Sequence, residues 1–312
     1  MPEAAVTVVS AGWAPAAAVL LGVLAIAAAT LDGVLTARSA GAARSGLARP
    51  IGEVARLMRQ RRRTTLAADS LLWRIGGAGL LLMALMIVTV VPLGEWTLFD
   101  LDVGVVWFTA MDVLAWAFVW LAGWGANSAH ALVGGYRFLA HGLAYELPLM
   151  FALVAPATAA SSLNVGTIAA AQQGLWFVAW MPVAFLAYCV GVLAVAVWGP
   201  FSPAVGADVA GGVTTELAGV DRLLFQAGRY ALLAAGSAFA VPMFLGGGAG
   251  PLLPGWGWVL VKTLALLAVL VWLRRRLPAA RPDLFMELGW VVLLPAVLAQ
   301  DLLVAIVAAG RG

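Results

Sequence analysis

The sequence has little of what soluble proteins carry on their surfaces. Charged residues make up 11% of its 312 residues, and Lys262 is the only lysine. Cys189 is the only cysteine, which excludes an internal disulfide and any cysteine-based cluster or zinc site. The longest polar interval, about 37–70, is too short to bury a core of its own. If the protein works in a redox system, the redox centres lie in other chains.

Apolar residues are abundant instead, at 63% of the chain. A helix needs about 20 mostly apolar residues to cross a membrane. The first 10 residues lack the basic segment of a signal peptide, so the first apolar run is expected to stay as a helix. We predict an all-α integral membrane protein that forms a single polytopic domain over 1–312. Its eight predicted spans are approximately 13–36, 71–93, 104–126, 143–163, 174–198, 228–250, 255–273 and 284–309.

Basic residues are distributed unevenly between the predicted loops. Nine of the 18 lysines and arginines lie between Arg38 and Arg74, and four more lie between the last two predicted spans. The positive-inside rule then places the loops after odd-numbered spans in the cytoplasm and both termini outside. The excess of basic residues reflects this topology. The sequence lacks the combination of basic and aromatic residues that would indicate nucleic-acid binding.

An amphipathic helix is predicted over about 46–63, between the first two spans. Ile51, Val54 and Met58 recur there at helical spacing, and a run of arginines follows them. Acidic lipid and a partner protein are equally good ligands for such a helix, and the two interpretations are compatible.

The segment 121–148 places ionisable side chains between two apolar runs. Arg137, His141 and Tyr145 are spaced at i, i+4 and i+8, so they share one face if the segment is helical, and Glu146 follows. A charge at membrane depth is costly unless it is paired or hydrated, so this cluster predicts a functional site. The alternatives are a solvated loop between helices and, for His141, a hydrogen-bonded interfacial histidine.

A few other ionisable residues fall inside predicted spans. Lys262 sits within an apolar run, which indicates either a proton-relay role or a structural ion pair with Asp112 or Asp301. Asp32 is a further intramembrane acid.

Four blocks of the sequence resemble the H subunit of respiratory complex I, the proton-pumping NADH-quinone oxidoreductase, and related subunits of membrane-bound hydrogenases. The strongest is AGWGANSAHALVGGYRFLAHGLAYELP, which is similar to the family pattern A-G-W-x-S-N-x-x-x-A-L-x-G-x-x-R-x-x-A-Q-x-I-S-Y-E. The others are RPIGEVARLM, GVTTELAG and VLVKTLALLAVLVWLRRRLPAARPDLFMELGWVVLLP. The similarity covers about 46–306.

The resemblance implies a multi-pass subunit of the plasma membrane at the heel of an L-shaped complex. Its cytoplasmic loops would form the floor of a quinone cavity, with quinone the substrate of the complex and membrane lipid around the chain. Partners would be other membrane-arm subunits and peripheral iron-sulfur subunits. FMN and iron-sulfur clusters would lie in those partners, and this chain would bind no metal or cofactor and catalyse nothing alone.

The resemblance also assigns roles to individual residues. Clustered carboxylates in a low dielectric are expected to exchange protons near neutral pH. The relay candidates are Glu146, Asp208, Glu216 and Lys262. The candidates for the quinone cavity or subunit interface are Arg49, Glu53, Arg56, Arg137, His141, Tyr145, Arg281 and Asp283. Secondary intramembrane acids are Asp32, Asp112 and Asp301.

The chain departs from the family in the central signature A-E-T-N-R-A-P-F-D, which appears here as AVAVWGPFS. Val195, Trp198 and Ser202 stand where a glutamate, an arginine and an aspartate are expected. A divergent complex I-like subunit and a subunit of a hydrogenase- or ferredoxin-linked complex that need not bind quinone both fit. A stand-alone secondary transporter is the alternative from another class, although the sequence shows no convincing internal repeat. A purely structural scaffold in the membrane arm is a third alternative, because several loop acids are missing.

Overall fold

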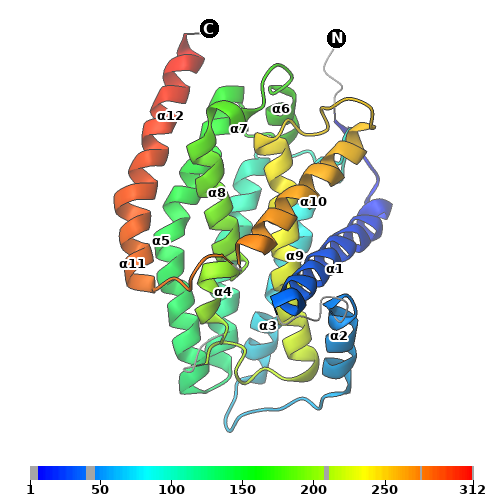
Figure 1. Cartoon of the computed structure of the whole chain (residues 1–312), viewed down its shortest axis with the longest axis vertical. Coiled ribbons are helices and arrows are strands. Elements are labelled where there is room, and N and C mark those ends of the chain that lie inside the picture. The colour runs from blue at the N-terminus through cyan, green and yellow to red at the C-terminus, as the bar shows by residue number, and fades with distance from the viewer. Residues whose placement is uncertain (1–5, 40–45, 207–210, 275, 311–312) are drawn as a thin grey trace.

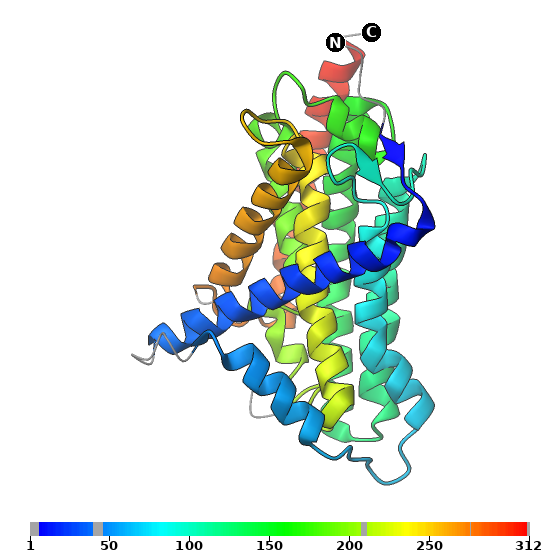
Figure 2. The ribbon, with the colours of Figure 1, turned by 90° about the vertical axis from the view of Figure 1, so that its right-hand side faces the viewer.

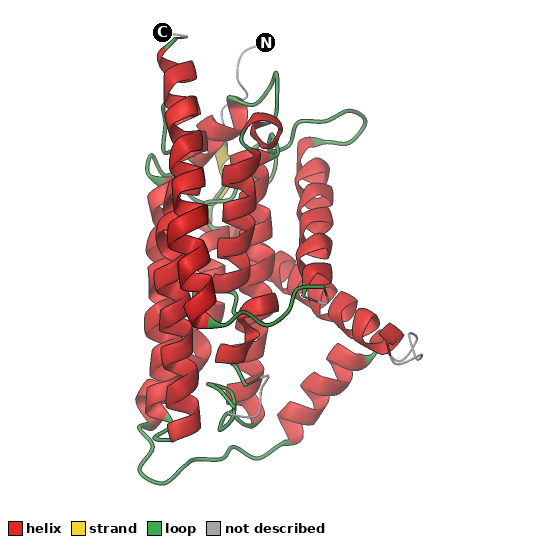
Figure 3. Ribbon diagram, turned by 60° about the vertical axis from the view of Figure 1, so that its left-hand side comes forward, coloured by secondary structure: helices red, strands yellow, loops and turns green. Residues whose placement is uncertain are grey.

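The computed structural model describes residues 6–39, 46–206, 211–274 and 276–310 (Figure 1). The described chain is almost entirely helical, as the colouring of Figure 3 shows, which confirms the predicted all-α class. Long helices lie side by side along the long axis, and both ends of the described chain lie at the same end of the bundle (Figure 1). The α-helices are α1 (Ala14–Ser39), α2 (Arg49–Arg59), α3 (Ser70–Val88), α4 (Gly104–Gly125), α5 (Ala129–Ala160), α6 (Val165–Ala170), α7 (Phe177–Trp180), α8 (Pro182–Val195), α9 (Gly219–Phe244), α10 (Gly255–Leu273), α11 (Pro282–Glu287) and α12 (Leu294–Ala309).

Short elements complete the described chain. The strands β1 (Thr7–Val8) and β2 (Trp96–Thr97) pair in parallel, with Thr7 opposite Trp96. This pairing ties the start of the chain to the loop that follows α3. The turns η1 (Ala11–Trp13) and η3 (Gly199–Ala204) are 3-10 helices, whereas η4 (Leu288–Leu293) is a π-helix that joins α11 to α12.

Seven helices of the described residues are long and apolar enough to cross a membrane, one fewer than predicted. The missing one is the predicted span 228–250, which corresponds to α9. That helix has 26 residues, but Asp221, Arg222 and Arg229 lower its apolar character. The C-terminal half of α9 is buried among other helices, so it has less need of an apolar surface than a lipid-facing span.

Two further boundaries differ from the sequence expectation. The predicted span 174–198 is interrupted at Met181, because Pro182 begins α8 and supplies no N–H to continue α7. The predicted span 143–163 is part of a longer helix, since α5 already begins at Ala129. The interpretation of 121–148 as a solvated loop is therefore wrong.

α1 crosses the bundle diagonally, and α2 folds back beside the lower end of α9 (Figure 2). Within α2, Leu57 is fully buried, whereas Ile51 and Met58 are 72% and 61% exposed. The apolar face of α2 is therefore mostly turned away from the bundle, as expected of a helix that lies in a membrane interface.

The core brings α5 close to the chain that leads into α12. A Cβ on Gly289 would clash with the carbonyl oxygen of Ala144. Pro148 has no N–H to offer to that carbonyl, so the i+4 hydrogen bond of α5 is missing there. The Trp290 indole donates to the neighbouring carbonyl of Leu143 at 3.0 Å. Gly289 thus allows η4 to pack directly on the backbone of α5.

We expect the Gly289→Ala substitution to destabilise the protein. The added methyl group cannot fit against a backbone oxygen without moving η4, and overpacking of this kind costs about 1–3 kcal/mol. The measurement is the thermal unfolding midpoint of the purified protein in detergent. Gly22→Ala is the matched control, because nothing lies within 4 Å of a Cβ placed there. Equal midpoints for the two variants would contradict the close contact.

Candidate functional site

One helix carries most of the ionisable side chains that the sequence singles out. α5 holds Arg137, His141, Tyr145 and Glu146, which confirms the helical condition set on their spacing. His141 and Tyr145 are buried, whereas Arg137 and Glu146 are partly buried. The four residues therefore line the inner side of a span rather than a loop.

A second acid faces this cluster from the neighbouring helix. Asp112 of α4 is 1% exposed, and the Tyr145 hydroxyl donates a long hydrogen bond of 3.4 Å to its Oδ1 atom. The Glu146 carboxyl lies within interaction distance of the Asp112 carboxyl. The sequence ranked Asp112 as a secondary acid, but the structure places it beside the principal one. No sequence signal joins two residues that lie 34 positions apart on different helices.

The Asp112 and Glu146 carboxyl groups receive few hydrogen bonds from the rest of the described chain. Within the described residues, no donor reaches Oδ2 of Asp112 or either carboxylate oxygen of Glu146. Two carboxylates that meet in a low dielectric repel each other, so such a pair characteristically holds one proton between its members. The arrangement of Asp112, Tyr145 and Glu146 can therefore accept and release a proton as a unit.

His141 lies in an aromatic setting. Its ring makes edge contacts with Phe201 and Phe285, with centroids 5.3 Å and 6.0 Å away. Neither ring nitrogen has a hydrogen-bond partner of good geometry among the residues described. The ring is held by this aromatic packing, and the Ala280 backbone also lies within interaction distance of it. The hydrogen-bonded interfacial histidine considered from the sequence stays a prediction. The ring links α5, η3 and α11.

Glu216 is held at the start of α5. The Ser128 hydroxyl, at the N-cap position of α5, donates to Oε1 of Glu216 at 2.9 Å. This contact connects the loop before α9 with the helix that carries the carboxyl pair. Asp208, the other loop acid predicted to take part in a relay, lies outside the described residues.

Lys262 does not form the predicted ion pair. Its ammonium group donates to the carbonyl oxygens of Leu245, Gly247 and Ala249 at 2.7, 2.9 and 2.8 Å. The Nζ atom also lies 4.1 Å from the centroid of the Trp176 ring. The lysine closes the turn after α9, and a structural pairing with Asp112 or Asp301 is wrong. The two carboxylate oxygens of Asp301 meet no donor in the described part of the chain.

Asp32 belongs to a separate polar cluster. Its Oδ2 atom forms an ion pair with Arg274 at 2.8 Å and accepts from the Tyr230 hydroxyl at 3.2 Å. Arg274 and Arg229 lie over the Trp198 ring, 4.6 and 5.5 Å from its centroid. From the sequence, Trp198 was notable only because it stands where the family has an arginine. The structure shows two arginines from other helices gathered on this ring.

The remaining candidates form local pairs on the surface. Glu53 accepts two hydrogen bonds from Arg56, which hold the pKa of its carboxyl below the ordinary value. Arg281 binds Asp283 at 2.7 Å, and Arg49 is exposed. Exposed pairs of this kind contribute little to stability. Their side chains are available to a partner.

Metal ligands are not gathered in the described part of the chain. No group of three or more His, Cys, Asp or Glu side chains there is placed to hold a metal ion. Cys189 is buried in α8.

Comparison with known proteins gives a consistent picture. Residues 10–305 match the family described as NADH dehydrogenase. The chain is 35% identical over 269 residues to the second NADH-quinone oxidoreductase H subunit of Geobacter sulfurreducens, which covers 83% of this chain and 82% of that protein. It is 31% identical to the H subunit of Geobacillus kaustophilus over 85% and 82% of the two chains. The second H subunit of Cereibacter sphaeroides is 39% identical over 68% of this chain and 67% of its own length.

Proposed function

Because this chain belongs to the NADH dehydrogenase family, we propose that it is the membrane-embedded H subunit of an NADH-quinone oxidoreductase. In that role it is one subunit of an enzyme and catalyses nothing alone. Its partners are the other membrane subunits and the peripheral iron-sulfur subunits, which carry FMN and the clusters. Quinone is the substrate of the whole complex.

We propose that the carboxyl pair of Asp112 and Glu146 couples quinone reduction to proton transfer. The observation that carries this assignment is the meeting of two membrane-buried carboxyl groups with one donor, the Tyr145 hydroxyl. Reduction of a quinone consumes protons and changes the charge nearby. A carboxyl pair that shares a proton responds to such a change by taking up or giving up that proton.

The route from a quinone to the pair runs along α5 in this proposal. His141 and Arg137 lie about one and two helical turns before Tyr145, and Ser128 links the start of α5 to Glu216. The loop that holds Glu216 and the surface residues Glu53, Arg56, Arg281 and Asp283 would then face the quinone cavity or the peripheral subunits. The positive-inside rule predicts that this end lies in the cytoplasm and both termini outside.

A hydrogenase- or ferredoxin-linked complex, in which this subunit need not bind quinone, is the second candidate. The segment in which the family carries a glutamate, an arginine and an aspartate here holds Val195, Trp198 and Ser202. Trp198 is buried and lies under the guanidinium groups of Arg229 and Arg274. This region is therefore built differently from a carboxylate-rich quinone entrance, which favours a complex in which this subunit does not bind quinone.

The proposal is tested by isolating the tagged chain from its native membrane. We expect iron-sulfur and other membrane subunits to co-purify, together with NADH:quinone reductase activity that drives proton uptake into inverted vesicles. Activity only with hydrogen or reduced ferredoxin would select the second candidate. Isolation of the chain alone, with ion transport in liposomes, would support the stand-alone transporter and refute both candidates.

A further inference from the structure

An apolar cavity of about 540 Å³ lies between α1, α9 and α10, under the loop that contains β2. α1 and α10 converge where Asp32 binds Arg274, and they diverge toward the other end of the bundle (Figure 2). The cavity occupies the wedge between them. It lies apart from the carboxyl pair of α4 and α5, and none of the proton-transfer candidates lines it.

The lining of this cavity suits hydrocarbon and does not suit water. Fifteen of its seventeen lining residues are apolar and the other two are threonines. The Thr97 hydroxyl is already directed to the carbonyl of Phe99 at 3.2 Å, and Thr263 is 1% exposed. A buried water needs about two to four polar partners. The Thr263 hydroxyl alone cannot provide them, so an alkyl chain is the fitting occupant.

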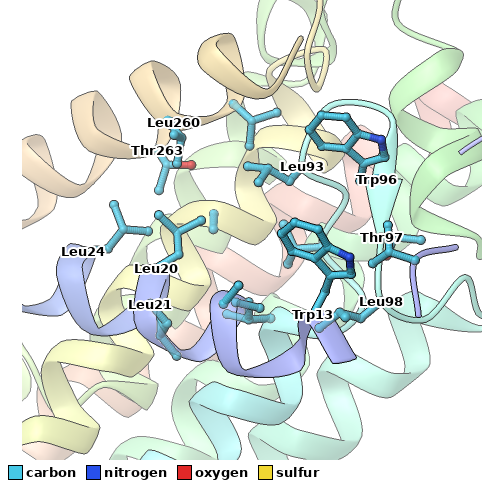
Figure 4. Close-up of a pocket in the computed structure, with 17 residues that line it drawn as sticks. Trp13, Leu20, Leu21, Leu24, Leu93, Trp96, Thr97, Leu98, Leu260 and Thr263 are labelled. Carbon is cyan, nitrogen blue, oxygen red and sulfur yellow. The ribbon is translucent and has the colours of Figure 1, made fainter. Parts of the chain in front are cut away.

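The two ends of the cavity differ. Figure 4 shows the indoles of Trp13 and Trp96 at one end and Leu24 and Thr263 at the other. Both tryptophans are partly open to the surroundings, at 61% and 49% exposure. Tryptophan is enriched where a membrane meets water, because one side of the indole is apolar and the other is polar. The tryptophan end therefore lies near lipid headgroups, and the Leu24 end lies deeper in the hydrocarbon.

Charge near the tryptophan end selects among headgroups. The loop 91–103, which carries Trp96, has three exposed acids, Glu95, Asp100 and Asp102, and no basic residue. An anionic headgroup would be repelled there. A headgroup that carries a primary ammonium is attracted to the indole faces and can donate its N–H groups to the carboxylates, whereas the methylated ammonium of phosphatidylcholine has no N–H to donate.

We infer that this cavity is a binding site for one acyl chain of phosphatidylethanolamine, with the headgroup at Trp13 and Trp96. Ligand cavities of about 300–1,000 Å³ commonly enclose a small organic molecule, so the volume accommodates an acyl chain. The bound chain fills the wedge between α1 and α10 and so supports the attachment of α1 to the bundle.

The test uses the complete complex, reconstituted in phosphatidylcholine vesicles with phosphatidylethanolamine that carries a photoreactive group on one acyl chain. We expect adducts on residues 13–24 and 259–263 that unlabelled phosphatidylethanolamine suppresses more strongly than phosphatidylglycerol does. Ala17→Phe, which puts a ring into the cavity, is expected to lower labelling about tenfold, equivalent to about 1.4 kcal/mol of binding free energy. Val19→Phe is the matched control, because Val19 is 67% exposed and does not line the cavity.

Three results would overturn the inference. Labelling of the lining that Ala17→Phe leaves unchanged would place the lipid elsewhere. Equal suppression by phosphatidylglycerol would remove the headgroup assignment. Stronger suppression by a long-chain quinone would make the occupant a quinone tail. If Ala17→Phe does not assemble, the competition experiment on the unsubstituted complex still decides between these outcomes.

Discussion

Replacing Glu146 with glutamine is expected to reduce quinone reductase activity and proton uptake about a hundredfold or more, while the complex still assembles. A group that transfers a proton directly contributes about 10²–10⁴-fold to a rate. Glutamine keeps the size of the side chain and offers a donor to Asp112, so the fold tolerates it. It cannot take up or release a proton, so the pair loses its function. Activity, proton uptake into inverted vesicles and a native gel are measured together.

The Asp112→Asn variant sharpens this experiment. If the two carboxyl groups share one proton, either substitution disables the pair, and the double variant should be little worse than each single one. Glu287→Gln is the matched control, because Glu287 is an exposed acid of α11. Unchanged activity and pumping in Glu146→Gln would refute the coupling role. Additive losses in the double variant would show that the two acids act separately.

Replacing Lys262 with methionine is expected to reduce the amount of assembled complex and its thermal stability, with catalysis per assembled complex largely kept. The ammonium group satisfies three backbone carbonyls after α9 and stacks on Trp176. Methionine has a similar length but no donor, and each buried carbonyl left without a donor costs about 1–3 kcal/mol. The measurements are the yield on a native gel, the unfolding midpoint and the turnover of the remaining complex.

A neighbouring substitution provides the control for Lys262. Thr263→Val removes a buried hydroxyl that has no hydrogen-bond partner among the described residues, so its effect on stability should be small. The opposite pattern for Lys262→Met, with normal yield and midpoint but lost proton uptake, would restore the relay role suggested by the sequence. A fall in yield and unfolding midpoint thus indicates the structural role, whereas a fall in proton uptake alone indicates the relay role.

The sequence predicted the membrane class and the helical face of Arg137, His141 and Tyr145, because both follow from the period and length of apolar runs along one segment. It did not predict the partner of Lys262. Backbone carbonyls cannot be recognised as ligands from a sequence, so the distant acids Asp112 and Asp301 were the partners that it suggested. It also counted α9 as an apolar span, although the burial of that helix against its neighbours, rather than its own hydropathy, determines where it lies.

Contacts between distant segments were the other part that the sequence could not supply. Asp112 and Glu146 each stood out as intramembrane acids, but their meeting depends on how α4 packs against α5. The gathering of Arg229 and Arg274 on Trp198 joins segments from three parts of the chain. Resemblance to a family indicated the candidate residues, whereas the two arginines that lie over Trp198 are found only from the structure.

The gap in the hydrogen-bond ladder of α5 at Pro148 has a mechanical consequence. The carbonyl of Ala144, which Pro148 leaves free, lies against Gly289, and the Leu143 carbonyl accepts from Trp290. The next two residues of α5 are Tyr145 and Glu146. The outer face of α12 is exposed, with Leu302 and Leu303 at 63% and 64%. We therefore expect a neighbouring membrane protein that displaces α12 to shift, through η4, the turn of α5 that carries Glu146, which would link lateral force to proton affinity through one glycine and one proline.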